Sequence, residues 1–117
     1  MILVRNVRAS AAWYCALLGC TSDHGRDDFD RLVHGGRVLL MLHQLGAAEH
    51  GMPEPAGEAP GSGFLLWVYV DDLDAVYRRA RRQDALIVSE PHDNPDAGWR
   101  EFTLRDPDGF SIAIAQV

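Results

Sequence analysis

The sequence predicts an α+β fold in which two halves, each with the order strand, helix and three strands, form one domain. The chain has 117 residues, which is enough for one hydrophobic core but not for two independent ones. A short apolar strand followed by a helix opens the chain, and the same order begins again at Phe64. We therefore expect a single domain with modules at residues 1–44 and 64–117, joined by a connection at residues 45–63.

The first half is expected to contain one helix and four short strands. The helix, from about Ala9 to Leu18, follows Asn6, carries apolar side chains at helical spacing and is stopped by Gly19. Two glycines, Gly35 and Gly36, supply a hairpin turn. The strands are expected at residues 1–4, within residues 21–28, at residues 29–34 and at residues 37–44.

The second half repeats this order after a long connection that is rich in glycine and proline and has almost no hydrophobic periodicity. A strand is expected at residues 64–70. Asp72 or a neighbour is expected to cap a helix that runs to about Gln83, with its arginines on the solvated side. A short strand at residues 86–89 and a closing hairpin complete the half.

The closing hairpin has one apolar face and one face of small or polar side chains. Asp106-Pro107-Asp108-Gly109 has the residues of a tight turn. Alternation places large apolar side chains on one face, and these are Phe102, Leu104, Phe110, Ile112 and Ile114. We expect a helix to cover that face. The opposite face fills little volume, so it leaves room for a ligand.

The two halves align as an internal duplication. Residues 4–6 fall on residues 70–72, and residues 40–44 fall on residues 112–116. If each half is a curved sheet with a helix on one face, two halves placed edge to edge leave their small-residue faces lining a shared cleft.

Composition and charge make some partners less favourable than others. The formal net charge of −6 disfavours a nucleic acid or an anionic membrane and mildly favours a cationic ligand. No apolar run has the length of a membrane span, and the N-terminus lacks the pattern of a signal peptide, so we expect a cytoplasmic protein. The spacing of Cys15 and Cys20 matches no zinc or redox motif, which indicates reduced, structural cysteines.

Three motifs resemble the vicinal oxygen chelate superfamily, which includes glyoxalase I, the extradiol dioxygenases, the fosfomycin resistance enzymes and the bleomycin resistance proteins. They are the aromatic pair Trp13-Tyr14 before Leu18-Gly19, the run Val70-Asp71-Asp72-Leu73-Asp74, and Arg100-Glu101-Phe102 leading into Asp106-Pro107-Asp108-Gly109. The resemblance covers nearly the whole chain and implies paired βαβββ modules around a cleft. It also implies a homodimer, because members commonly dimerise.

The resemblance further implies four metal-ligand positions, usually His or Glu, on the first and last strands of each module. Here the aligned positions are Leu65, Met41 and Ala113, and the fourth falls before Met1. Leucine and alanine have no lone pair to donate, and a methionine sulfur is a soft ligand that does not suit the hard divalent ions of these enzymes. We therefore expect no metal, no other cofactor and no catalytic residues.

Two titratable side chains are nevertheless predicted on the cleft face. His43 lies two residues beyond Met41 on the same strand face, and Glu101 lies on the hairpin face. They could form half of a displaced metal site or an acid–base pair. Two groups are too few for a metal site, and the other histidines are expected in loops or at strand ends; these are His24, His34, His50 and His92.

The remaining cleft residues are aromatic. Trp67 and Tyr69 share a strand face with Leu65, and Trp99 precedes the last hairpin. Aromatic side chains in a concave site offer stacking surface with a polar handle, although Trp67 could instead simply fill the place of the absent metal. By resemblance to the bleomycin resistance proteins, we predict a metal-free protein that binds or sequesters a small, aromatic and cationic ligand, such as an antibiotic. The predicted ligand-binding residues are Trp67, Tyr69, Trp99, Glu101, His43 and Met41. The alternative is a lyase, isomerase or dioxygenase that depends on a divalent metal.

Overall fold

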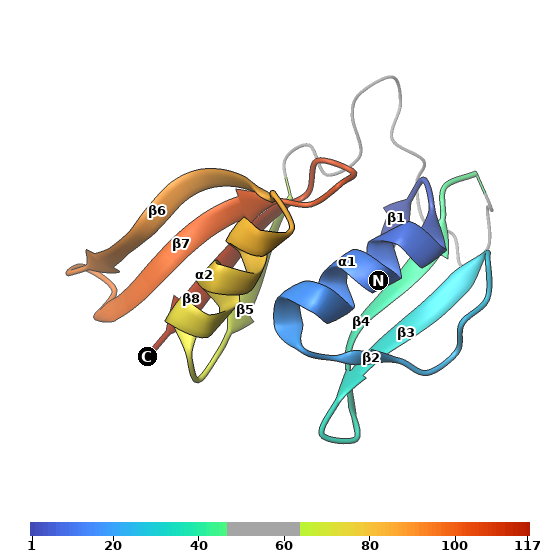
Figure 1. The fold of residues 1–117 in the computed structure, drawn as a ribbon, viewed down its shortest axis with the longest axis horizontal. Coiled ribbons are helices and arrows are strands. Elements are labelled where there is room, and N and C mark those ends of the chain that lie inside the picture. The colour runs from blue at the N-terminus through green and yellow to red at the C-terminus, as the bar shows by residue number, and fades with distance from the viewer. Residues whose placement is uncertain (47–63) are drawn as a thin grey trace. The chain divides into compact units, whose positions relative to one another are not determined.

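The computed structural model describes residues 1–46 and 64–117, so most of the predicted connection at residues 45–63, including His50, lies outside the described residues. The chain divides into two units, one within residues 1–60 and one within residues 61–117. Each unit has one helix and a four-stranded mixed sheet (Figure 1). This confirms the predicted α+β fold of two βαβββ modules.

The first unit is built on a sheet with the strand order β1-β4-β3-β2. Strand β1 pairs with β4 in parallel, and the other two pairs are antiparallel. Strands β3 and β4 have the predicted bounds, and the turn between them uses positive φ at both glycines. The elements are β1 (Ile2–Val4), α1 (Val7–Leu18), β2 (Thr21–Ser22), β3 (Phe29–His34) and β4 (Arg37–Gln44).

The second unit repeats this arrangement with the strand order β5-β8-β7-β6. Strand β5 pairs with β8 in parallel, while β8 with β7 and β7 with β6 are antiparallel. The elements are β5 (Leu65–Tyr69), α2 (Leu73–Arg82), β6 (Leu86–Asn94), β7 (Trp99–Arg105) and β8 (Ser111–Gln116).

The duplication holds at the level of single residues. In the parallel pair of the first unit, Leu3 lies opposite His43. In the second unit Tyr69 lies opposite Ala115. These are the pairs that the alignment of the two halves makes equivalent, so the two sheets share one register.

Both helices begin at equivalent polar caps. The Oδ1 atom of Asn6 accepts a hydrogen bond from Ala9 N at 2.9 Å, and that of Asp72 accepts one from Ala75 N at 2.8 Å. The cap at Asp72 confirms the prediction. Helix α1 begins at Val7, two residues earlier than expected, because Asn6 itself is the cap. Neither helix that the structure describes is long and apolar enough to cross a membrane.

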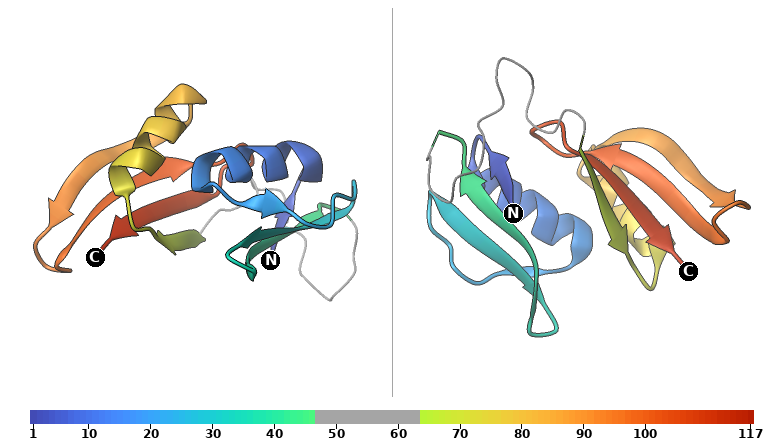
Figure 2. Two further views of the ribbon diagram at one scale, coloured as in Figure 1. Left: turned by 60° about the horizontal axis from the view of Figure 1, so that its bottom comes forward. Right: turned by 180° about the vertical axis from the view of Figure 1, so that it is seen from behind.

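In each unit the helix packs on one face of its sheet (Figure 2). The buried apolar side chains of helix and sheet form the core between them. In the second unit Leu73, Val76 and Ala80 of α2 face the large buried side chains of β7 and β8, which are Phe102, Leu104, Ile112 and Ile114. The predicted apolar face of the closing hairpin is therefore confirmed. The view from behind shows that no helix of the described part covers the other face of either sheet.

Strand β6 is longer than predicted. The expectation of a strand ending at residue 89 is wrong, because pairing with β7 continues to Asn94 through two register shifts. Strand β6 contains a proline at residue 91. It is tolerated because β6 is the outer strand of its sheet, where one row of backbone N–H groups needs no ladder partner.

Candidate functional site

Three aromatic side chains gather on the face of the second sheet that α2 does not cover. Trp67 and Tyr69 come from β5, and Trp99 comes from the start of β7. The ring centroids of Trp67 and Trp99 are 5.6 Å apart, those of Tyr69 and Trp99 are 6.2 Å apart, and those of Trp67 and Tyr69 are 6.4 Å apart. The side chains of Trp67 and Tyr69 are 40% and 59% exposed. We call these three residues the aromatic cluster.

Small residues on β8 make this cluster possible. Strand β8 lies between β5 and β7, so the ring of Trp99 must reach across it to meet the other two rings. The residues of β8 opposite Trp67 and Tyr69 are Ala113 and Ala115, which are both buried. A larger side chain at either position would occupy the space that the rings bridge. The small-residue face predicted from the hairpin is thus the floor of the cluster.

The carboxylate of Glu101 is held at the edge of the cluster. One of its oxygens accepts a hydrogen bond from Trp99 Nε1 at 2.5 Å, and the other accepts one from Asn94 Nδ2 at 3.3 Å. The Nε2 atom of His92 lies 3.6 Å from the second oxygen. The side chain of Glu101 is 15% exposed. The carboxylate therefore fixes the Trp99 ring and still presents part of its negative charge beside it.

His92 and Asn94 were not predicted as site residues, because the strand that carries them was expected to end before them. The sequence contains a signal for them in the turn that follows. Asn94 O accepts a hydrogen bond from Gly98 N at 2.9 Å, and Gly98 has a φ of +77°. Such a turn pairs Asn94 with Trp99 and His92 with Glu101, as the structure shows.

Met41 and His43 belong to the first unit, where both lie on β4 two residues apart. Met41 is partly exposed, but His43 is only 3% exposed. Its ring centroid is 6.1 Å from that of Phe29, and its Nδ1 atom lies 3.2 Å from Gln44 O. Four of the six predicted ligand-binding residues are thus brought together in the second unit, and the other two lie on β4 of the first unit.

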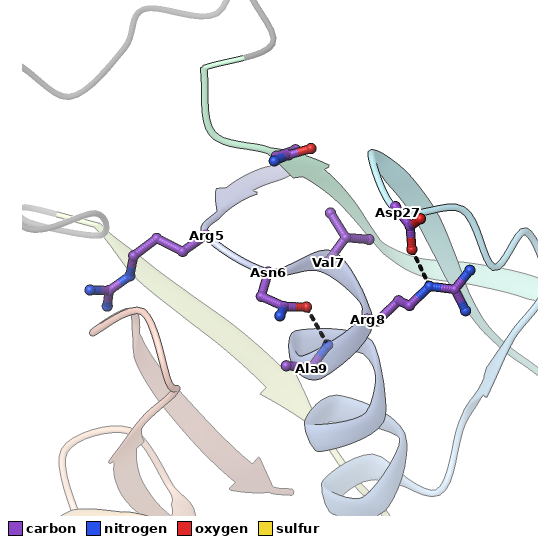
Figure 3. Close-up of a pocket in the computed structure, with 7 residues that line it drawn as sticks. Arg5, Asn6, Val7, Arg8, Ala9 and Asp27 are labelled. Carbon is purple, nitrogen blue, oxygen red and sulfur yellow. Dashed lines mark hydrogen bonds and ion pairs between the residues drawn. The ribbon is translucent and has the colours of Figure 1, made fainter.

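A separate hollow of about 400 Å³ lies at the start of α1 (Figure 3). Asn6 and Arg8 line it, together with Asp27 from the loop before β3. The Asn6 side chain caps the helix, and the Arg8 guanidinium pairs with the Asp27 carboxylate, which raises the pKa of Arg8 above its ordinary value. Each of these three side chains therefore has a partner within the first unit.

The donor set does not fit the metal that the fold implies. Leu65 and Ala113, two of the aligned ligand positions, lie on the same sheet face as the aromatic cluster and have no lone pair. Their side chains present only carbon to that face. Within residues 1–46 and 64–117, no group of three or more His, Cys, Asp or Glu side chains is arranged to hold a metal ion.

The model of the glyoxalase/bleomycin resistance protein/dioxygenase superfamily matches residues 1–114. Because this match spans nearly the whole chain, the protein belongs to that superfamily. The resemblance drawn from the sequence motifs is confirmed.

Two curated relatives match the chain along most of its length. It is 27% identical to the anthracycline biosynthesis protein DnrV of Streptomyces peucetius over 93% of its own length, and it spans 42% of the length of DnrV. It is also 27% identical to the uncharacterized protein YwbC of Bacillus subtilis (strain 168), over 98% of this chain and 92% of YwbC.

Among solved structures, a glyoxalase/bleomycin resistance protein/dioxygenase family enzyme from Burkholderia phytofirmans PsJN has a TM-score of 0.77 at 22% identity, covering 99% of this chain and 94% of its own. TioX from Micromonospora sp. ML1 has a TM-score of 0.74 at 21% identity, covering 98% of this chain and 93% of its own. Both similarities show a shared fold and nothing more.

Proposed function

We propose that this protein is a metal-free binding protein for a small aromatic molecule that carries a cationic group, and that the ligand stacks on the aromatic cluster beside Glu101. The observation that carries the proposal is the cluster itself. Large aromatic side chains are normally removed from water, yet Trp67 and Tyr69 are exposed on a sheet face next to a fixed carboxylate.

Stacking supplies the affinity in this proposal. An aromatic ligand that lies on one or two rings gains on the order of 1 to 3 kcal/mol for each stacked ring, by analogy with base stacking on aromatic side chains. The contact between Trp99 and Glu101 holds one ring in place before the ligand arrives. A rigid surface of this kind loses little side-chain entropy on binding.

Charge supplies the selectivity. The Glu101 carboxylate is mostly shielded from water, where a charge-assisted hydrogen bond contributes more than it does on an open surface. Asn94 and Trp99 are neutral donors, so their hydrogen bonds leave the carboxylate charge in place for a cationic ligand, and His92, 3.6 Å away, offsets that charge only when its ring is protonated.

One relative supports an aromatic ligand. DnrV bears the name of anthracycline biosynthesis, and anthracyclines are planar, fused-ring compounds, many of which carry an amino sugar. Such a compound has both features that the cluster would recognise. We propose sequestration of a compound of this chemical class, and hence resistance to it when it is an antibiotic.

The test is a binding titration with doxorubicin, a cationic anthracycline, and with an uncharged anthraquinone as the comparison compound. Every protein in the titration also carries Trp13→Phe. The remaining tryptophan fluorescence then comes from Trp67 and Trp99. Both compounds should quench this emission at saturable concentrations. Trp67→Ala should weaken both by roughly tenfold, which corresponds to about 1.4 kcal/mol. Glu101→Gln should weaken doxorubicin more than the anthraquinone.

A matched pair of tyrosines controls for the face of the sheet. Tyr69 lies in the cluster, whereas Tyr77 lies on α2, on the opposite side of the same sheet, against Phe102. Tyr69→Ala should weaken binding, and Tyr77→Ala should not. Equal affinities for Tyr69→Ala and Tyr77→Ala would show that the aromatic cluster does not bind the ligand.

The alternative is a metal-dependent lyase, isomerase or dioxygenase, since the superfamily to which the chain belongs includes enzymes. It is tested by metal analysis of protein purified without chelator and by thermal shift with Mn²⁺, Ni²⁺, Zn²⁺ and Fe²⁺. The binding proposal predicts less than stoichiometric metal and no rise in melting temperature. One bound ion per chain, with a higher melting temperature, would favour the enzyme.

A further inference from the structure

The two cysteines of the chain touch at the C-terminal end of α1. The Sγ atoms of Cys15 and Cys20 are 3.7 Å apart, and both cysteines are free. Cys20 is buried, while Cys15 is partly exposed. Residues five apart in a helix would not face each other in this way, so the contact depends on how the helix ends.

The end of α1 brings the two thiols together. Gly19 adopts the left-handed conformation, with a φ of +68°, and its N–H donates a hydrogen bond to Cys15 O at 2.9 Å. In a helix end of this kind the residue after the glycine folds back over the last turn and contacts a side chain there. Cys20 is that residue, and its Sγ atom also lies 3.7 Å from Tyr14 O.

Reagents from solution can reach this pair. A hollow of about 380 Å³ lies beside the thiols, and Ala11, Ala12 and Arg8 of α1 line it together with both cysteines. The alanines keep the hollow open because their side chains are small. Cys15 is the more exposed of the two, so it is the sulfur that an incoming reagent meets first.

We propose that Cys15 and Cys20 form a modification site that is converted to an intramolecular disulfide by a low-molecular-weight disulfide such as glutathione disulfide. The Cys15 thiolate attacks one sulfur of glutathione disulfide, which forms a mixed disulfide on Cys15 and releases one glutathione thiolate. The Cys20 thiolate then attacks the Cys15 sulfur and releases the second glutathione thiolate. Two protein thiols are oxidised, one glutathione disulfide is reduced to two thiols, and the two protons of the cysteines pass to the released glutathione.

The geometry requires only a small movement. A disulfide bond is about 2.05 Å long, so the sulfur atoms must approach each other by less than the width of one atom. Cys20 adjoins β2, a strand of two residues. A short strand and a partly exposed side chain offer little resistance to such a shift.

The order of the two steps agrees with the ionisation of the pair. Burial, together with the hydrogen bond and the charge interaction with Cys15, raises the pKa of Cys20 to about 12. Cys20 is therefore a poor first nucleophile. Once Cys15 carries glutathione it has neither a thiol proton nor a thiolate charge, so the smaller contributions of Cys15 to this raised pKa are removed while the effect of burial remains. Cys20 then attacks a sulfur that already lies beside its own, 3.7 Å away in the reduced protein.

The test is incubation of the reduced protein with glutathione disulfide, followed by intact-mass measurement and peptide mapping. The wild-type protein should lose two hydrogens, retain no titratable thiol and yield a peptide in which Cys15 is linked to Cys20. The two single variants separate the steps. Cys20→Ser should stop at one glutathione adduct on Cys15, and Cys15→Ser should stay unmodified because Cys20 is buried.

Three outcomes would overturn the proposal. The wild-type protein could retain both thiols, it could stop at a stable glutathione adduct, or it could form disulfides only between chains. All three are read on the wild-type protein, so they do not depend on whether the variants fold. Circular dichroism of each variant before oxidation shows whether the variant has the fold of the wild-type protein, so that their oxidation products can be compared.

Discussion

Trp67 shows how burial separates a binding residue from a core residue. Its side chain is exposed on the open face, whereas Leu104, on the other face of the same sheet, is fully buried beneath α2. Trp67→Ala removes ring contacts worth about 0.5 to 1.5 kcal/mol each but opens no sealed cavity. We expect the free energy of unfolding to fall by roughly 1 to 2 kcal/mol.

Urea denaturation of both variants checks this prediction. Leu104→Ala is the matched control and should cost about 2 to 5 kcal/mol, because it leaves a cavity in the core. If Trp67→Ala costs as much as Leu104→Ala while ligand affinity is unchanged, Trp67 is a packing residue and the proposed function fails at this position.

Asp30 is a buried carboxylate that holds the loop between β2 and β3. It accepts hydrogen bonds from Ser22 Oγ at 2.6 Å and from the backbone N–H groups of Gly25 and Arg31 at 3.0 and 2.8 Å. Burial alone would raise the pKa of Asp30, but these hydrogen bonds outweigh it, and the pKa lies below its ordinary value. The charged form is therefore the one that the fold stabilises.

A pH dependence follows from this lowered pKa. The stabilisation is complete above the pKa of aspartate in an unfolded chain, about 3.9, and is lost as the pH falls through the lower folded-state value. Asp30→Asn should lower the free energy of unfolding by roughly 2 to 3 kcal/mol at pH 7, and by less at pH 3. Urea denaturation at pH 7 and at pH 3 measures the two losses of free energy of unfolding. Asp28→Asn, at an exposed ion pair with Arg26, should cost less than about 1 kcal/mol at either pH.

At the scale of the element, the β6–β7 hairpin positions the polar side chains that lie beside the aromatic cluster. Its turn sets Asn94 opposite Trp99 and His92 opposite Glu101. Gly98 carries positive φ in that turn, and a Cβ atom added there would meet no atom within 4 Å. Any cost of substitution at Gly98 therefore comes from the backbone conformation alone.

Gly98→Ala should lower the free energy of unfolding by about 1 kcal/mol, because alanine avoids the left-handed region. Asparagine tolerates that region better, so Gly98→Asn is the matched control and should cost less. Thermal unfolding of both variants gives the comparison. A loss for Gly98→Asn that equals the loss for Gly98→Ala would show that side-chain volume, rather than backbone conformation, decides this turn.

Most elements were predictable because their signals are local. The turn glycines, the apolar alternation of β7 and β8, and the caps at Asn6 and Asp72 act within a few residues. Strand β6 was predicted too short. It continues past a proline at residue 91, which is tolerated because β6 lies at the edge of its sheet, and that position depends on the whole topology.

At the scale of the whole molecule, we propose a homodimer, because apolar side chains stand on incompletely paired strands. Leu86 and Val88 are exposed on β6, the outer strand of its sheet. Val38 and Leu39 are exposed on the part of β4 that, within the described residues, pairs only with β3. Edges of this kind are commonly covered by a second chain.

Light scattering at micromolar concentration should therefore give the mass of two chains. Val88→Lys and Leu39→Lys place a charge at one edge each, and the variant that dissociates identifies the edge in contact. A wild-type protein that scatters as a monomer would contradict the dimer. If both variants remain dimers, these two edges do not form the contact between the chains.

The sequence by itself determined the two βαβββ modules and their common register, because periodicity, caps and turn residues act over short distances. It also singled out the three residues of the aromatic cluster and Glu101 as candidates for ligand binding. Tertiary structure decided which of these side chains meet. The Trp99 ring reaches the rings of β5 only because β8 lies between them with alanines on that face. Cys15 meets Cys20 only because the helix ends at a left-handed glycine. In each case the contact depends on how the backbone places residues in space, which spacing along the chain does not record.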